Sequence, residues 1–105
     1  MSTTSTDLLF SALADPNRRL IVEQLAGEGP ATATDLAGRL GVTRQGAAKH
    51  LASLAEAGIV VASREGREVR YEFVDRGLEP GQAWLDRVGS QWDRRLARLR
   101  SHLDD

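Results

Sequence analysis

The segment between Thr32 and Gly58 constrains the fold most, because two helix patterns follow each other there within a few residues. Thr32 and Asp35 have the spacing of a capping box, and Gly41 is placed to end the helix that they begin. Thr43 can cap a second helix, for which Gly58 supplies a left-handed C-terminal residue. Two short helices joined by so tight a turn predict a helix-turn-helix.

The outward side of the second predicted helix is polar, basic and small. Its apolar residues fall in one sector of a helical wheel, namely Ala47, Ala48, Leu51, Leu54 and Ala55. The other side presents Arg44, Gln45, Gly46, Lys49, His50 and Ser53. A helix fits the major groove of DNA, where Gln pairs with adenine and Arg or Lys with guanine. This side predicts base recognition, with a merely solvated face as the alternative, and we expect His50 to donate to a phosphate rather than pack against the body.

A β-hairpin is expected after the second helix. β-Branched and aromatic residues lie on both sides of the polar segment 63–68, which has Gly66 at its tip. Two strands after a helix-turn-helix form a wing, and its cations are Arg64, Arg67 and Arg70. Guanidinium groups at such a tip can reach phosphates or the minor groove. Glu65 and Glu68 weaken the local field, so a solvated hairpin without a DNA contact is the alternative.

Three further helices complete the expected architecture. A first short helix contains Leu8, Leu9, Ala12 and Leu13, and a second begins at Asp15-Pro16 and runs to about Gly27. The last helix follows Gly81 and carries an apolar stripe of Trp84, Leu85, Val88, Trp92, Leu96, Leu99 and Leu103. The fold class is therefore mainly α with a β-hairpin wing, in the order α-α-α-α-β-β-α and as one domain over residues 1–105. A domain this small cannot cover that stripe alone, which predicts a homodimer.

Charge and composition narrow the classes of function. The 105-residue chain has a net charge of only -1, but residues 39–70 hold six cations against three glutamates and so suit a polyanion. With no cysteine, no metal-ligand cluster and no Gly-rich phosphate loop, we expect neither an enzyme nor a cofactor. No apolar run approaches a membrane span, and the start lacks the features of a signal peptide, so we expect a cytoplasmic protein without membrane contact.

Three blocks of the sequence resemble successive parts of the ArsR family of winged helix-turn-helix repressors. They are LADPNRRLIVEQLA, TDLAGRLGVTRQGAAKHLASLAEAGIV and SREGREVRYEF, and they span roughly residues 13 to 73. The resemblance implies a homodimer, paired mainly through its first and last helices, whose recognition helices enter successive major grooves of a double-stranded DNA operator. It assigns the DNA contacts to Thr43, Arg44, Gln45, Lys49 and His50 of the recognition helix and to Arg64, Arg67 and Arg70 of the wing. The expected dimer interface comprises Leu8, Leu9, Leu85, Val88, Trp92, Leu96, Leu99 and Leu103.

The sequence departs from the metal sensors of that family. Where they carry a cysteine motif this chain reads Ala-Thr-Asp-Leu-Ala, and the last helix holds a single histidine, His102. Soft and borderline metals prefer Cys or several His ligands, so we expect no metal site. Regulation would then come from the abundance of the protein or from an unidentified small-molecule effector, an apolar one near Trp84 and Trp92. The functional alternative is a winged helix that binds another protein and not DNA.

Overall fold

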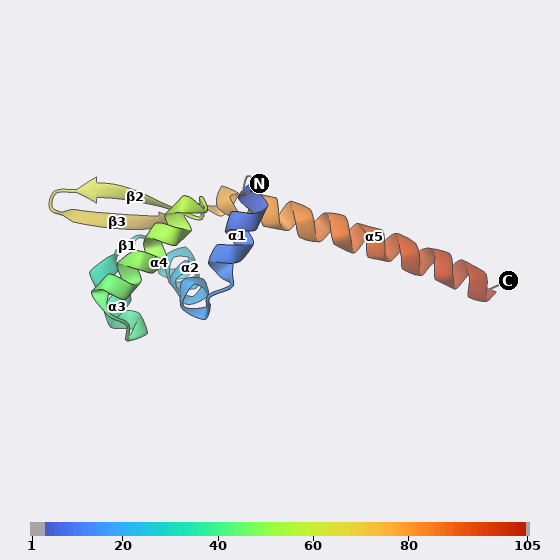
Figure 1. Cartoon of the computed structure of the whole chain (residues 1–105), viewed down its shortest axis with the longest axis horizontal. Coiled ribbons are helices and arrows are strands. Elements are labelled where there is room, and N and C mark those ends of the chain that lie inside the picture. The colour runs from blue at the N-terminus through green and yellow to red at the C-terminus, as the bar shows by residue number, and fades with distance from the viewer. Residues whose placement is uncertain (1–3, 105) are drawn as a thin grey trace.

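The computed structural model describes residues 4–104 and has the winged helix-turn-helix architecture expected from the sequence. Four short helices form the body, with a hairpin on one side and a long helix projecting from the other (Figure 1). The helices of the body are α1 (Ser5–Leu13), α2 (Pro16–Glu28), α3 (Ala33–Leu40) and α4 (Arg44–Glu56). The remaining elements are β1 (Ala31–Thr32), β2 (Val60–Glu65), β3 (Glu68–Phe73), the 3-10 turn η1 (Asp75–Leu78) and α5 (Glu79–Asp104).

Side-chain caps fix where the helices begin, and three of them were predicted. Asp15 Oδ1 accepts the backbone N–H groups of Asn17 and Arg18 at 2.8 and 3.3 Å. Thr32 and Asp35 form the reciprocal capping box of α3, and Thr43 Oγ1 caps α4. The glycines that end the two helices of the motif also behave as expected, because Gly41 and Gly58 both have positive φ angles. Local sequence chemistry therefore accounts for the turn of the helix-turn-helix.

The sheet has one more strand than the sequence suggested. β1 pairs antiparallel with β3, with Ala31 opposite Tyr71 and Thr32 opposite Arg70, so the strand order is β1-β3-β2. A strand of two residues is too short to show any alternation of apolar and polar residues, which explains why it was missed. Its effect is to attach the base of the wing to the segment that begins the helix-turn-helix.

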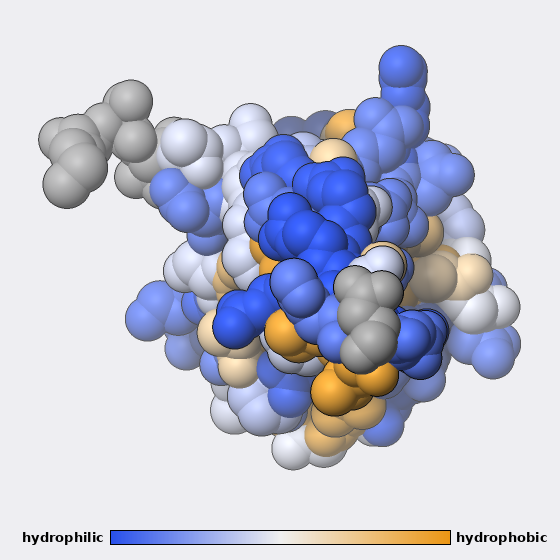
Figure 2. All heavy atoms as spheres, turned by 90° about the vertical axis from the view of Figure 1, so that its right-hand side faces the viewer, coloured by the Kyte–Doolittle hydropathy of each residue, from blue (hydrophilic) through white to orange (hydrophobic). Residues whose placement is uncertain are grey.

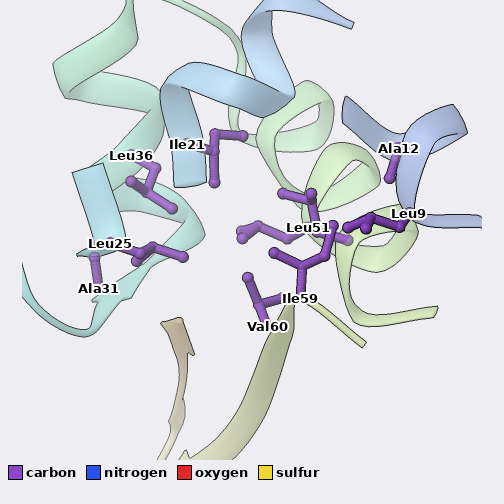
Figure 3. Close-up of a cluster of buried hydrophobic side chains, with 10 residues drawn as sticks. Leu9, Ala12, Ile21, Leu25, Ala31, Leu36, Leu51, Ile59 and Val60 are labelled. Carbon is purple, nitrogen blue, oxygen red and sulfur yellow. The ribbon is translucent and has the colours of Figure 1, made fainter. Parts of the chain in front are cut away.

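The core lies where the four short helices meet the base of the wing (Figure 3). Its fully buried large side chains are Leu9, Ile21, Leu36, Leu51, Leu54 and Ile59. Two residues that the helical pattern placed on the apolar face of α4 are exposed instead, namely Ala48 and Ala55. The two alanines lie on either side of the buried sector of α4. At these positions a small apolar side chain is exposed to water at little cost. The buried part of α4 is consequently narrower than predicted, and its outward face is wider.

Helix α5 is fastened to the body only near its N-terminus. Gly81 is buried there, and a Cβ atom at this position would collide with Cδ2 of Leu9 on α1. Beyond this crossing the helix of 26 residues, about 39 Å long at 1.5 Å per residue, projects away from the body (Figure 1). No helix within residues 4–104 combines the length and apolarity that crossing a bilayer requires.

Candidate nucleic-acid interface

The N-terminal half of α4 presents its polar side chains to solvent. The side chains of Arg44, Gln45 and Lys49 are exposed, and Thr43 accepts the backbone N–H of Gly46 at 2.9 Å. A Cβ atom at Gly46 would lie 3.0 Å from Thr43 Oγ1, so a glycine leaves room for this cap. The first turn of α4 is therefore held firmly while its long side chains remain free to reach outward, as base recognition requires.

A groove separates the helix-turn-helix from the wing. Its lining comes from three elements that are distant in the sequence: Thr32, Ala33, Thr34 and Asp35 at the start of α3, Arg44, Gln45 and Ala48 of α4, and Arg67, Glu68, Val69 and Tyr71 of the wing. Three of the predicted DNA contacts, Arg44, Gln45 and Arg67, thus line one surface. These three side chains can donate hydrogen bonds to a nucleic acid. The groove also holds two carboxylates, those of Asp35 and Glu68.

The three arginines of the wing have different surroundings. Arg70 Nε lies 3.1 Å from Glu65 Oε2, and its Nη2 lies 3.4 Å from Glu68 Oε2. Arg64 Nε donates to the backbone carbonyl of Gly66 at 3.4 Å, whereas Arg67 is exposed and lines the groove. Arg70 was predicted as a DNA contact, but its charge is already shared by two carboxylates of the same hairpin. Among the predicted wing contacts, Arg67 is the best placed.

Asp35 gives the groove a fixed negative charge. The backbone N–H of Thr32 and then its hydroxyl hold the pKa of Asp35 below its ordinary value, against the smaller opposing effect of desolvation. The positive charges of Arg39 and Arg70 lower this pKa further. The carboxylate is therefore ionised at neutral pH and stabilises the start of α3, and a phosphate would be repelled from this part of the groove.

His50 lies at the edge of α4 that faces α2. It is half-buried, and its Nδ1 accepts a hydrogen bond of 3.2 Å from Nε of Arg18. One ring nitrogen of His50 is therefore already bound within the chain, and donation from this residue to a phosphate stays a prediction. Arg18 was not singled out from the sequence because its partner is 32 residues away and no local pattern signals the contact. Ser53, also predicted at the interface, is half-buried.

The apolar stripe of α5 is largely uncovered. Trp84, Leu85, Val88, Trp92, Leu99 and Leu103 are between 41% and 85% exposed, and Leu96 is half-buried. Figure 2 looks at the molecule from the side on which α5 projects and shows apolar residues gathered below a strongly polar side. From Leu85 to Leu103 the apolar residues follow one another at steps of 3, 4, 4, 3 and 4 residues, which keeps them on one face of a straight helix.

Helix α1 contributes differently from what was expected. Leu9 is 2% exposed and belongs to the core of its own chain, so its assignment to a dimer interface was wrong, whereas Leu8 is half-buried. Phe10, which was not predicted, is 37% exposed and meets Trp84 edge to face with ring centres 5.5 Å apart. The spacing of α1 could not distinguish these faces, because apolar residues occupy more than one side of so short a helix.

A shallow pocket lies where α1 and α5 diverge. It is lined by Thr4, Thr6, Asp7, Phe10, Trp84 and Arg87. Trp92, which the sequence suggested as a second wall for an effector, is not part of it and instead lies under the guanidinium of Arg95, 5.9 Å from the ring centre. Within residues 4–104, no three His, Cys, Asp or Glu side chains are grouped closely enough to hold a metal ion.

The helix-turn-helix of the chain matches a known family model. The model, described as a helix-turn-helix domain, matches residues 13–61. The HTH-type transcriptional regulator CmtR of Mycobacterium tuberculosis (strain H37Rv) is 46% identical over 71 residues, which cover 67% of this chain and 58% of CmtR. The chain thus spans little more than half the length of this relative.

Two solved structures resemble the whole architecture. An ArsR-like transcriptional regulator from Rhodococcus sp. RHA1 has a TM-score of 0.80 and 39% identity, over 92% of this chain and 91% of that one. The homodimeric winged helix-turn-helix DNA-binding domain Mb0332 from Mycobacterium bovis has a TM-score of 0.66 and 25% identity, over 83% of this chain and 80% of that fragment. The similarity therefore includes the wing and most of the helices.

Proposed function

Because the chain belongs to the ArsR family of winged helix-turn-helix regulators, we propose that it is a transcriptional repressor that binds a DNA operator as a homodimer. One observation supports the DNA contact most directly. Arg44 and Gln45 of α4 and Arg67 of the wing line a single groove, with Lys49 exposed on the same helix. In this proposal α4 enters the major groove, and Arg67 neutralises the adjacent backbone or enters the minor groove.

The homodimer rests on the uncovered face of α5. A stripe of six exposed apolar side chains on a projecting helix is an association surface, and a second copy of the same face is its simplest partner. Phe10 and Leu8 of α1 extend this surface at the base of α5. A twofold dimer would present two α4 helices to half-sites one turn of DNA apart. The homodimeric Mb0332 domain, which has the same fold, supports this arrangement.

The remaining parts of the proposal concern regulation and location. We place a small-molecule effector in the pocket between α1 and α5, where Phe10 and Trp84 supply aromatic surface and Asp7 and Arg87 supply charge. A ligand there would act by changing how α5 leaves the body. We propose no metal response and no catalytic role, and we propose the cytoplasm as the location, where a repressor meets its operator.

Binding to selected DNA tests the proposal. Fragments retained by the protein from genomic DNA would be labelled, and binding followed by fluorescence anisotropy. Replacing Gln45 and Lys49 by Ala should leave the fold unchanged and weaken specific binding, by about 1–3 kcal/mol for each good hydrogen-bonded pair with a base that the substitution removes. The matched control replaces Gln91 and Arg94 by Ala, since both are exposed on α5 outside its apolar stripe.

Two results would contradict the proposal. If the Gln45→Ala, Lys49→Ala variant bound the selected DNA as tightly as the unchanged protein, α4 would not be the recognition helix. If the unchanged protein bound no DNA and its retention did not depend on salt, a protein-binding winged helix would be the better description, because phosphate contacts always release counterions.

A further inference from the structure

Arg18 of α2 and His50 of α4 form the one hydrogen bond between side chains of two helices in the described part of the chain. Nε of Arg18 donates to Nδ1 of His50 at 3.2 Å, and both side chains are half-buried. An Nδ1 that accepts a hydrogen bond carries no hydrogen itself, so in this pair the ring N–H of His50 is the one on Nε2. The pair thus fixes the orientation of two polar side chains beside the recognition helix.

Most of the hydrogen-bonding capacity of Arg18 remains unused. A guanidinium has five N–H donors, and the bond to His50 uses the one on Nε. Within residues 4–104, neither Nη1 nor Nη2 of Arg18 makes a hydrogen bond or an ion pair. A guanidinium held by one edge has given up part of its rotamer freedom before any ligand arrives, and its outer edge has the geometry that binds phosphate oxygens.

The pair lies on a side of α4 that the groove does not use. The groove is lined by α3, α4 and the wing, with no residue of α2, whereas His50 directly follows the exposed Lys49 and faces α2. DNA backbones run along both edges of a major groove that holds a helix, so contacts on two sides of α4 are expected. The wing supplies one side with Arg67, and α2 can supply the other with Arg18.

One charge near the pair opposes this role. The carboxylate of Asp15 caps α2, and its pKa lies below the ordinary value: desolvation raises it, but the backbone N–H groups of Asn17 and Arg18, and the positive charge of Arg18, lower it more. Asp15 is therefore ionised at neutral pH, and its charge interacts with that of Arg18. Its negative charge weakens the attraction of Arg18 for a phosphate and can be removed while the cap is kept, because Asn caps helices as well as Asp.

We propose that Arg18, held by His50, is a further DNA-binding residue that contacts a backbone phosphate of the operator and extends the binding surface from α4 onto α2. The proposal rests on the proposed DNA-binding function. It makes the contact independent of base sequence, so that specific and non-specific DNA lose affinity in the same proportion when Arg18 is changed.

Salt dependence gives the test, since it counts phosphate contacts. For Arg18→Gln we expect the slope of log affinity against log salt to fall by about 1.8, because each subunit of the proposed dimer loses one contact and one contact on duplex DNA contributes about 0.9. Raising salt from about 50 to about 200 mM would then weaken the unchanged protein about twelvefold more than the variant. Arg94→Gln, the same change at an exposed position of α5, should leave the slope unchanged.

Two further variants make the result decisive. Arg18→Lys keeps a cation and should restore most of the slope, while Asp15→Asn should tighten binding to both kinds of DNA. If Arg18→Gln folds, shows the thermal transition of the unchanged protein and keeps its full salt slope, the inference is wrong although DNA binding stands. If Arg18→Gln does not fold, the other two variants decide. The inference is then wrong if Asp15→Asn binds DNA with unchanged affinity and Arg18→Lys has a smaller salt slope than the unchanged protein. A protein without any salt-dependent DNA binding would instead refute the proposed function itself.

Discussion

Gly81 is the point at which α5 is attached to the body, and replacing it by Ala should loosen this attachment. The new Cβ would collide with Cδ2 of Leu9, which is 2% exposed and packed in the core, so Leu9 has little room to move. Gly81 does not have a positive φ angle, and the backbone itself therefore accepts Ala. The effect of the substitution is consequently one of packing and not of backbone strain.

The magnitude follows from two opposing contributions. Overpacking a core typically costs about 1–3 kcal/mol, and the better helix propensity of Ala returns at most about 1 kcal/mol. Because Leu9 has little room to move, we take the upper part of this cost, about 2–3 kcal/mol, and expect Gly81→Ala to lower the free energy of unfolding by about 1–2 kcal/mol. This corresponds to roughly 4–16 °C in Tm for a domain of this size. Part of this destabilisation should appear as weaker dimerisation, because α5 carries the proposed interface.

Gly38→Ala is the matched control. Gly38 lies inside α3, and nothing is within 4 Å of the Cβ atom that Ala would add. The same chemical change should there raise stability by about 0.5–1 kcal/mol through helix propensity alone. Thermal and urea unfolding at one fixed protein concentration would compare the two variants, since the stability of a dimer depends on concentration. If both variants shifted in the same direction by the same amount, the close contact between Gly81 and Leu9 would not limit the packing.

The apolar stripe, the capping carboxylate of α3 and the response to metals each give one further prediction. Trp92→Asp places a charge in the exposed apolar stripe of α5 and should give a monomer at micromolar concentration in sedimentation equilibrium, whereas a dimer of unchanged affinity would exclude this face from the interface. The pKa of Asp35 is lowered by its bonds to Thr32, so its carboxylate stabilises the fold at pH values above the ordinary pKa of 3.8. This contribution is lost as the pH falls through the folded-state pKa. Urea unfolding of Asp35→Asn should therefore show a smaller decrease of stability between pH 5 and acid pH than urea unfolding of the unchanged protein. Zinc, copper or arsenite added to a protein–operator mixture should leave the anisotropy unchanged, and a tenfold loss of affinity at stoichiometric metal would show a ligand set that the sequence does not reveal.

Much of the fold was predictable because its signals are local. Caps such as Thr43, and glycines such as Gly41 and Gly58, act within a few residues, so a turn of the helix-turn-helix can be located from sequence. β1 could not be found, because a two-residue strand is defined by its partner on β3 and not by its own pattern. The inward position of Leu9 likewise depends on the close approach of Gly81, which is a tertiary contact.

The candidate site was predictable in outline and less so in its electrostatics. The outward face of α4 follows from helical geometry, and Gln45 lies on it as expected. Which cations are free does not follow from the geometry of one element: Arg70 is neutralised by neighbouring carboxylates of the hairpin, and Arg18 is oriented by a residue on another helix. Arg67 and Arg70 belong to the same hairpin but differ in their surroundings. Arg70 forms an ion pair with Glu65, whereas Arg67 lines the groove.

A hydroxyl-radical footprint on a selected operator fragment tests the central proposal most directly, because it reports the number and spacing of the contacts that the protein makes with DNA. A homodimer with an α4 helix in each of two successive major grooves should protect two equivalent patches about 10–10.5 base pairs apart, centre to centre. Both patches should weaken together in the Gln45→Ala, Lys49→Ala variant. One isolated patch, or protection spread evenly without this spacing, would contradict the proposed dimeric recognition.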